Sequence, residues 1–211
     1  KSDLKAAYEI AHTWFWIAFA FFISAMWPNP ITIFISVWIL GGKQLACAII
    51  MHDTSHNAQF TSKGANRFFG NVFGGYPLFV DVDRYRPYHL AHHSHTGHDT
   101  DPDINLTKGY PAGKWSFTRK VVRDLVGLTG VKAFFGLMMI QCGLLQFNLG
   151  NNIVWLPKEE RKGIGHLLIF LRNMAGPIAT NFALWGILWL TGNGWLYLLW
   201  IGAYLTTYQF C

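Results

Sequence analysis

Five histidines occur in two short clusters, and their spacing is typical of metal ligands. His52 and His56 are four residues apart in the run HDTSH, and His89, His92 and His93 follow in HLAHH. Residues four apart share one face of a helix, with Cβ atoms roughly 5–6 Å apart, and the second cluster falls within a sector of about 100°. The sequence therefore predicts a metal site. The alternative is that these histidines are polar residues that only form hydrogen bonds at the membrane interface. Imidazole binds iron, zinc, copper and nickel, so the clusters alone do not name the metal.

The number and direction of these histidines indicate more than one metal ion. A zinc site usually takes three or four protein ligands, whereas five histidines are present here. His92 and His93 are adjacent in the chain and point somewhat apart on a helix, which suits two neighbouring ions better than one. The spacing therefore favours a dinuclear centre.

Both clusters border segments that are long and apolar enough to cross a membrane. The 211 residues are 52% hydrophobic and 13% charged, whereas soluble domains carry about 25% charged residues. A bilayer core of roughly 30 Å requires about 20 helical residues. We expect four spans at approximately residues 8–27, 31–51, 167–191 and 195–211. The predicted fold is an all-α integral membrane protein, with two transmembrane helical hairpins and a cytoplasmic histidine-rich helical cap.

The distribution of basic residues predicts the orientation. Of the 17 Lys and Arg residues, 14 lie between Lys43 and Lys162, and the two short turns between the expected spans have none. The positive-inside rule then places residues 52–166, with both histidine clusters, in the cytoplasm. From Lys43 to Lys162, 14 basic and 9 acidic residues give a net charge of +5, which reflects topology alone or a docking face for an acidic electron donor. No stretch interleaves aromatic and basic residues as a nucleic-acid surface would, so no nucleic-acid partner is predicted.

Ala133 to Leu156 is an uncharged stretch whose placement the sequence leaves open. It contains polar residues such as Gln141 and Gln146, and a fifth span here would move the basic residues at 158–162 to the outer face. We expect an interfacial or partly inserted helix that continues from the amphipathic run at 119–123.

Both ends of the sequence indicate a piece of a longer chain. The first residue is Lys1 rather than Met, and Cys211 falls inside an apolar run. We therefore expect residues 1–211 to be a single truncated membrane domain, whose activity belongs to a longer parent protein.

The two histidine motifs, in this order and beside a membrane hairpin, resemble those of the membrane fatty acid desaturase superfamily. HDTSH is followed 32 residues later by YHLAHHSHTGHDTDPD. The run DRYRPYH at 83–89 and the DPD at 101–103 are especially similar to bacterial desaturase-type proteins. The resemblance extends from about Gly41 to Cys211, and it depends on the pair of motifs, since either motif alone is less specific.

The resemblance implies a non-haem centre of two iron ions, with dioxygen as co-substrate. His52 and His56 match the first histidine box of the family, and His89, His92 and His93 match the second. A third box lies beyond the present sequence in the family pattern, so the piece alone is expected to be inactive. The implied reaction is desaturation of a lipid acyl chain, acyl-lipid or acyl-carrier, and a lipid or carotenoid hydroxylase or ketolase of the same superfamily is the alternative. The implied partners are membrane lipids and an electron donor such as a ferredoxin or a b-type cytochrome.

Four further residues near the clusters have two interpretations each. Asp53 either interacts with the helix terminus or forms a hydrogen bond with a ligand histidine. His95 either supports a ligand or relays electrons, or it is a solvated loop residue. Asp101 and Asp103 either orient ligand histidines or form a solvated turn around Pro102.

Two other classes of protein also use histidines and differ in features that can be checked. An intramembrane zinc hydrolase usually carries HExxH, with a glutamate base beside the first ligand, and Asp53 occupies that position here. Zinc also has no redox chemistry, so oxygen activation requires another metal. A haem-binding electron carrier requires paired histidines across two spans, and His12 is the only histidine inside a predicted span. Both classes fit less well than a di-iron oxidoreductase.

Overall fold

Helices make up the regular structure of the described chain. The computed structural model describes residues 1–148, 153–157 and 163–211. Within these residues the strand pairing is a single antiparallel bridge between Leu145 and Trp155, so the predicted all-α class is confirmed. The basic run at 158–162, which bears on the number of spans, lies outside the described residues.

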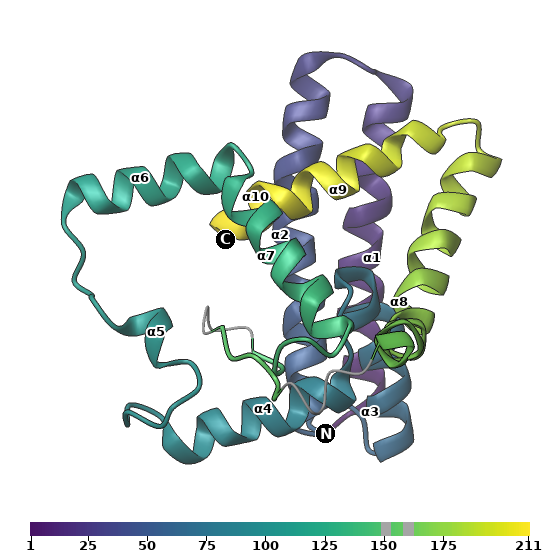
Figure 1. The fold of residues 1–211 in the computed structure, drawn as a ribbon. Helices are drawn as coiled ribbons and strands as arrows, with labels where there is room; N and C mark the ends of the chain where they lie inside the picture. Colours follow the sequence, from purple (N-terminus) through teal and green to yellow (C-terminus); the bar gives the residue numbers. More distant parts are fainter. Residues whose placement is uncertain (149–152, 158–162) are drawn as a thin grey trace.

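The first two helices form the hairpin that the sequence predicts. α1 spans Asp3–Met26 and α2 spans Pro30–Ser55, and Figure 1 shows them side by side and antiparallel. Asn29 starts α2 by accepting hydrogen bonds from the first backbone N–H groups, and the proline that follows lacks an N–H at a position where none is needed. Ser24 donates to Ser36 across the hairpin at 2.8 Å, which satisfies two buried hydroxyls. Because α2 continues past the predicted end at residue 51, the first histidine cluster begins within its last turns.

A run of short helices leads from the foot of α2 to the second histidine cluster. These are α3 (Lys63–Gly70), the π-helical η1 (Asn71–Gly75), the 3₁₀ turn η2 (Tyr76–Leu78) and α4 (Val82–His95), which carries the cluster; α5 (Ile104–Thr107) follows it. η1 packs directly on α2, since a Cβ at Gly74 would be 2.8 Å from the backbone nitrogen of Met51. Asp81 caps α4 by accepting from the N–H of Arg84 at 2.8 Å. α4 crosses the foot of α2 (Figure 1).

The next two helices are α6 (Lys114–Leu125), which projects from the bundle and runs toward it along the chain, and α7 (Leu128–Gln141), which lies against the bundle (Figure 1). The predicted helix, which continues from 119–123 into the stretch 133–156, is wrong in two places: Gly127, with φ of +84°, separates α6 from α7, and the described residues of this stretch after 141 are not helical. The chain turns at Gly143, where φ is +69°, a backbone conformation that glycine adopts without the steric cost of a Cβ. The antiparallel bridge between Leu145 and Trp155 follows this turn, so these described residues pair with each other instead of continuing the helix.

The second predicted hairpin is confirmed only in its first helix. α8 (Gly163–Leu190) is followed by the 3₁₀ turn η4 (Gly194–Leu196), α9 (Tyr197–Leu205) and α10 (Thr207–Phe210). A continuous helix through 195–211 is therefore wrong, because the backbone leaves helical geometry at Thr206, with φ of −118° and ψ of −87°. Packing on α2 accounts for the break, since Thr207 donates to the carbonyl of Val37 at 2.8 Å. Figure 1 shows α9 crossing α1 and α2.

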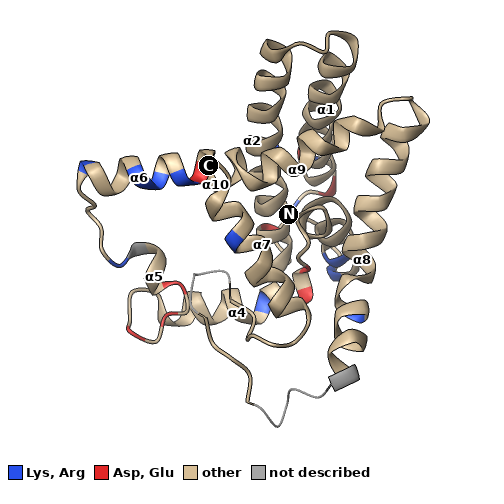
Figure 2. Ribbon diagram, turned by 45° about the horizontal axis from the view of Figure 1, so that its top comes forward, with Lys and Arg blue, Asp and Glu red and all other residues tan. Residues whose placement is uncertain are grey.

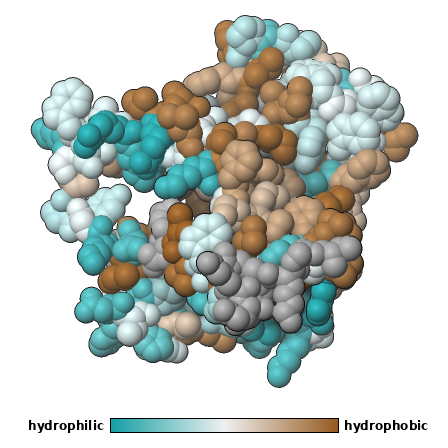
Figure 3. All heavy atoms as spheres, viewed as in Figure 1, coloured by the Kyte–Doolittle hydropathy of each residue, from teal (hydrophilic) through white to brown (hydrophobic). Residues whose placement is uncertain are grey.

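Three of the described helices are long and apolar enough to cross a membrane: α1, α2 and Gly165–Leu190 of α8. Large apolar side chains cover their outer faces; Phe15, Phe34 and Leu190 are 61%, 63% and 86% exposed. Such a surface fits lipid as its neighbour. The buried core lies where α9 crosses the first hairpin, around the fully buried Trp200. Figure 3 shows apolar residues over the middle of the molecule and hydrophilic residues along its left and lower margins.

Charged residues are distributed unevenly over the helices. Figure 2 shows Lys and Arg along α6 and on the segments around α4, whereas the α1–α2 and α8–α9 turns carry no charge. This distribution is the basis of the predicted cytoplasmic orientation, which stays a prediction.

Candidate metal centre

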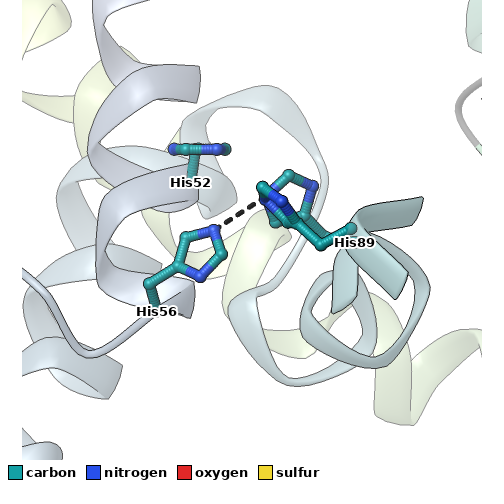
Figure 4. A group of neighbouring side chains, drawn as sticks. His52, His56 and His89 are labelled. Carbon is teal, nitrogen blue, oxygen red and sulfur yellow. Dashed lines mark hydrogen bonds between the residues drawn. The ribbon is translucent and has the colours of Figure 1, made fainter. Parts of the chain in front are cut away.

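Two histidines from α2 and two from α4 converge at the foot of the hairpin. The ligand nitrogens of His52, His56, His89 and His93 all lie within 4.8 Å of one another. Nε2 of His89 is 2.8 Å from Nε2 of His56 and 3.0 Å from Nε2 of His93. Figure 4 shows His52 and His56 on α2 pointing toward His89 on α4. The structure thus brings four of the five predicted ligands into one group.

The helical spacing of each cluster produces this convergence. His52 lies in the last turn of α2 and His56 is its C-cap residue, and their ring centroids are 5.0 Å apart. His89 and His93 are one turn apart on α4, with ring centroids 4.5 Å apart. Directly after His56 the chain leaves α2 through Asn57, whose φ of 52° lies in the left-handed region that asparagine tolerates.

The nitrogens of this group exceed what hydrogen bonding alone can satisfy. Nε2 of His89 faces two other Nε2 atoms, but a neutral imidazole nitrogen carries either one hydrogen or one lone pair. One N–H can serve only one of the two neighbours, whereas a cation can accept lone pairs from all three nitrogens. These residues therefore fit a metal centre, and their imidazole donors suit iron, zinc, copper and nickel.

His92 is turned toward two carboxylates instead. Its Nδ1 lies 2.7 Å from Oδ1 of Asp101 and 3.6 Å from Oδ2 of Asp103. Its ring remains beside the group, with a centroid 5.7 Å from that of His93. When Nδ1 donates its hydrogen to the carboxylate, Nε2 carries the lone pair, and this is the tautomer that binds a metal through Nε2.

Of the other residues predicted to orient ligands, Asp53 contacts a ligand histidine, whereas Asp103 and His95 lie farther from the group. Oδ1 of Asp53 is 2.7 Å from Nδ1 of His52, so the geometry fits the interpretation in which this carboxylate contacts a ligand. Asp103 accepts a hydrogen bond from the hydroxyl of Tyr88 and is farther from a ligand than Asp101. His95 is exposed and its Nδ1 bonds a backbone carbonyl of its own helix at 2.9 Å. The structure does not bring His95 to the group.

Burial and neighbouring groups set the charges at the site. Burial raises the pKa of Asp101, but hydrogen bonds from His92 and from the backbone N–H groups of Asp103 and Gly97 outweigh it and lower the pKa to about 2. Burial and the adjacent histidines lower the pKa of His89 to about 4, because both disfavour a positive ring. Near neutral pH the site therefore combines a fixed anion with neutral imidazole, which is the protonation state that binds metals.

A comparison with protein families places these residues in a known group. The fatty acid desaturase family model matches residues 25–211, which include both histidine clusters. The chain belongs to the fatty acid desaturase family. The resemblance found in the histidine motifs is thereby confirmed, and membership implies a di-iron oxidoreductase that acts on lipid in a membrane. Neither the curated proteins nor the solved structures contain a match to the chain.

Two residues beside the histidine group were not predicted. The ring of Tyr85 stacks on His89, with centroids 5.0 Å apart and planes at 14°. Arg86 donates to the carbonyl of Ser55 at the end of α2. Both belong to the DRYRPYH run, which served in the sequence only as a mark of resemblance. The sequence did contain a signal for Arg86, which lies one turn before the ligand candidate His89. A long arginine side chain at such a position can reach the end of a neighbouring helix.

Proposed function

We propose that this desaturase holds two iron ions and uses dioxygen to introduce a double bond into a lipid acyl chain. The convergence of four histidines from α2 and α4 carries the proposal. The proposed ligands of that group are His52, His56, His89 and His93, and His92 is the proposed ligand of the neighbouring ion. Iron supplies the redox chemistry that dioxygen reduction requires and that zinc lacks.

The chain's own contribution is to orient the imidazoles. Asp53 and Asp101 each lie 2.7 Å from an Nδ1 atom, of His52 and His92 respectively. A carboxylate at Nδ1 keeps the hydrogen there, presents the lone pair of Nε2, and restricts rotation of the ring. The proposed role of the two aspartates follows from this geometry.

Position supports an acyl chain as the substrate class. The histidine group lies where α2, a candidate span, ends, so a chain buried in the bilayer can approach it from the apolar side. Desaturation removes two hydrogens from adjacent methylene groups. With one dioxygen, two electrons and two protons, the products are an alkene and two waters. The electrons come from a donor such as a ferredoxin or a b-type cytochrome, for which the basic region at 43–162 is the proposed docking face.

Expression of the protein in a host without the activity tests the proposal. Gas chromatography with mass spectrometry of the host fatty acids, together with the iron content of the purified protein, compares wild type, His52→Ala and His93→Ala. The matched control is His98→Ala, which removes an exposed histidine beyond the end of α4. We expect a new double bond and bound iron in wild type and control, and the loss of both in the two site variants.

Each other outcome has a definite meaning. Wild-type turnover in either site variant would refute the ligand assignment. A hydroxylated or oxo product would place the protein with the lipid or carotenoid hydroxylases and ketolases of the same superfamily. Bound zinc with no oxidised product would favour a zinc hydrolase.

Proteolysis tests the proposed orientation, in which the histidine region is cytoplasmic. In sealed vesicles of known sidedness, trypsin added to the cytoplasmic face should cleave within α6, whose Lys114 and Arg119 are exposed. Cleavage from the opposite face would reverse the assignment.

A further inference from the structure

Arg86 joins the two helices that carry the histidine group. It lies on α4 one turn before His89, and its Nε donates to the carbonyl of Ser55 at 2.6 Å. Its Nη2 lies 3.3 Å from the carbonyl of Thr54 and 3.0 Å from Oδ1 of Asn57. One side chain therefore contacts three acceptors at the end of the helix that holds the first histidine cluster.

The end of α2 has a physical need for such a partner. The last carbonyls of a helix have no intrahelical N–H to bind, and they form the negative end of the helix dipole. The carbonyl of Thr54 already accepts from the N–H of Asn57 at 2.9 Å, and a cation with several N–H groups supplies further donors and is attracted to this helix end. The planar guanidinium presents its donors in a fixed fork, so it can bind several acceptors at once in one orientation.

The position of this contact matters for the metal site. Ser55 and Asn57 flank His56, and Arg86 is three residues before His89, so the contact lies within one helical turn of a histidine on each side. The two histidines it flanks have Nε2 atoms 2.8 Å apart. Any slide of α4 along α2 would change that distance directly.

We propose that Arg86 is a positioning residue that sets the distance between the histidine pair of α2 and the histidine pair of α4. The inference rests on the proposed function, because it assumes that the histidine group binds a metal. Arg86 contacts none of the histidines in the proposed role; it acts through the backbone of α2. Lysine cannot replace it fully, since an ammonium is a single point charge without the fork.

Cobalt(II) binding by the full chain in detergent tests this inference. Cobalt binds imidazole sites, and its visible absorption reports the number and geometry of its ligands. The variants are Arg86→Gln and Arg86→Lys. The matched control is Arg67→Gln, which removes an arginine that also binds α4, through Asp83 at 2.8 Å, but at an exposed position away from the histidines.

We expect Arg86→Gln to weaken cobalt binding at least tenfold and to change the absorption spectrum, with helix content by circular dichroism unchanged. Arg86→Lys should recover part of the affinity but not the wild-type spectrum, and Arg67→Gln should match wild type in both. Wild-type affinity and spectrum in Arg86→Gln would overturn the inference. So would an equal loss in Arg67→Gln, because it would reduce the effect to general weakening of α4.

A second variant covers the case in which Arg86→Gln fails to fold. Asn57→Gly keeps a residue suited to the left-handed backbone, with φ of 52°, and removes one acceptor of the fork. We expect a smaller loss of affinity with the same direction of spectral change; no change in either would count against the fork. Failure of the proposed function is recognised separately, because the wild-type chain itself would then show no cobalt spectrum that depends on His56.

Discussion

Replacement of Gly74 by alanine tests how closely the segment before α4 packs on α2. A Cβ at this position would lie 2.8 Å from the backbone nitrogen and 3.2 Å from the Cα of Met51, and 3.0 Å from the carbonyl oxygen of Cys47. Ordinary contact begins near 3.4 Å, so η1 must retreat by about 0.6 Å. No rotamer change can relieve the overlap, because every close atom belongs to the backbone. We therefore expect Gly74→Ala to destabilise the protein by about 1–3 kcal/mol, the usual range for overpacking.

Thermal unfolding in detergent measures this effect. For a chain of this length, about 1–3 kcal/mol corresponds to a fall in Tm of roughly 2–12 °C. Gly42→Ala on α2 is the control, since nothing lies within 4 Å of its Cβ, and alanine there should be neutral or stabilising by up to about 1 kcal/mol. Equal Tm values for the two variants would refute the close packing of η1 on α2. A fall in cobalt affinity that accompanies the fall in Tm would show that this packing also positions α4 and its histidines.

Further predictions concern single polar contacts. Asp101→Asn should weaken metal binding by about 10–100-fold, because the amide cannot hold the histidine ring as a carboxylate does, whereas Asp83→Asn on the exposed side of α4 should leave the cobalt titration unchanged. Gln141→Leu should lower the free energy of unfolding by about 1–3 kcal/mol, since it removes the acceptor of Arg84 Nη1 and leaves the part-buried carbonyl of Phe79, which the amide binds at 2.6 Å, without its donor; a denaturant titration with wild-type stability would contradict this. Trp14→Phe removes a 3.1 Å hydrogen bond from the indole to a carbonyl of η1 and should cost about 1 kcal/mol in the same titration; a wild-type midpoint there would show that the bond contributes nothing.

Local sequence patterns were sufficient to predict the first hairpin and the shared helix faces of the histidine clusters. Two apolar runs separated by a proline-bounded turn leave few other folds, because each run must satisfy its own backbone groups within lipid. His52 with His56, and His89 with His93, share helix faces through spacing alone. The same spacing predicted that His92 would diverge from its neighbour, and the structure places it beside the group and against Asp101.

Contacts between distant segments determined where two helices end, which local sequence patterns did not predict. The run at 195–211 has the composition of a span, yet it breaks at Thr206, where the next threonine bonds a carbonyl of α2. The uncharged stretch after Gln141 turns back at Gly143 instead of continuing as a helix. In both segments hydropathy is compatible with a helix, and the competing conformation is stabilised by partners that are far away in the sequence.

The sequence by itself determined that the chain is helical, that it has membrane-length apolar segments, and that five histidines have ligand spacing. These properties depend on residue type and on periods within one helix. Only the tertiary structure decided which nitrogens meet, because His56 and His89 belong to different helices and come within 2.8 Å through the packing of η1 on α2 and the contacts of Arg86. It also decided that Asp53 and Asp101 contact Nδ1 atoms, which hydrogen-bond geometry sets and spacing does not.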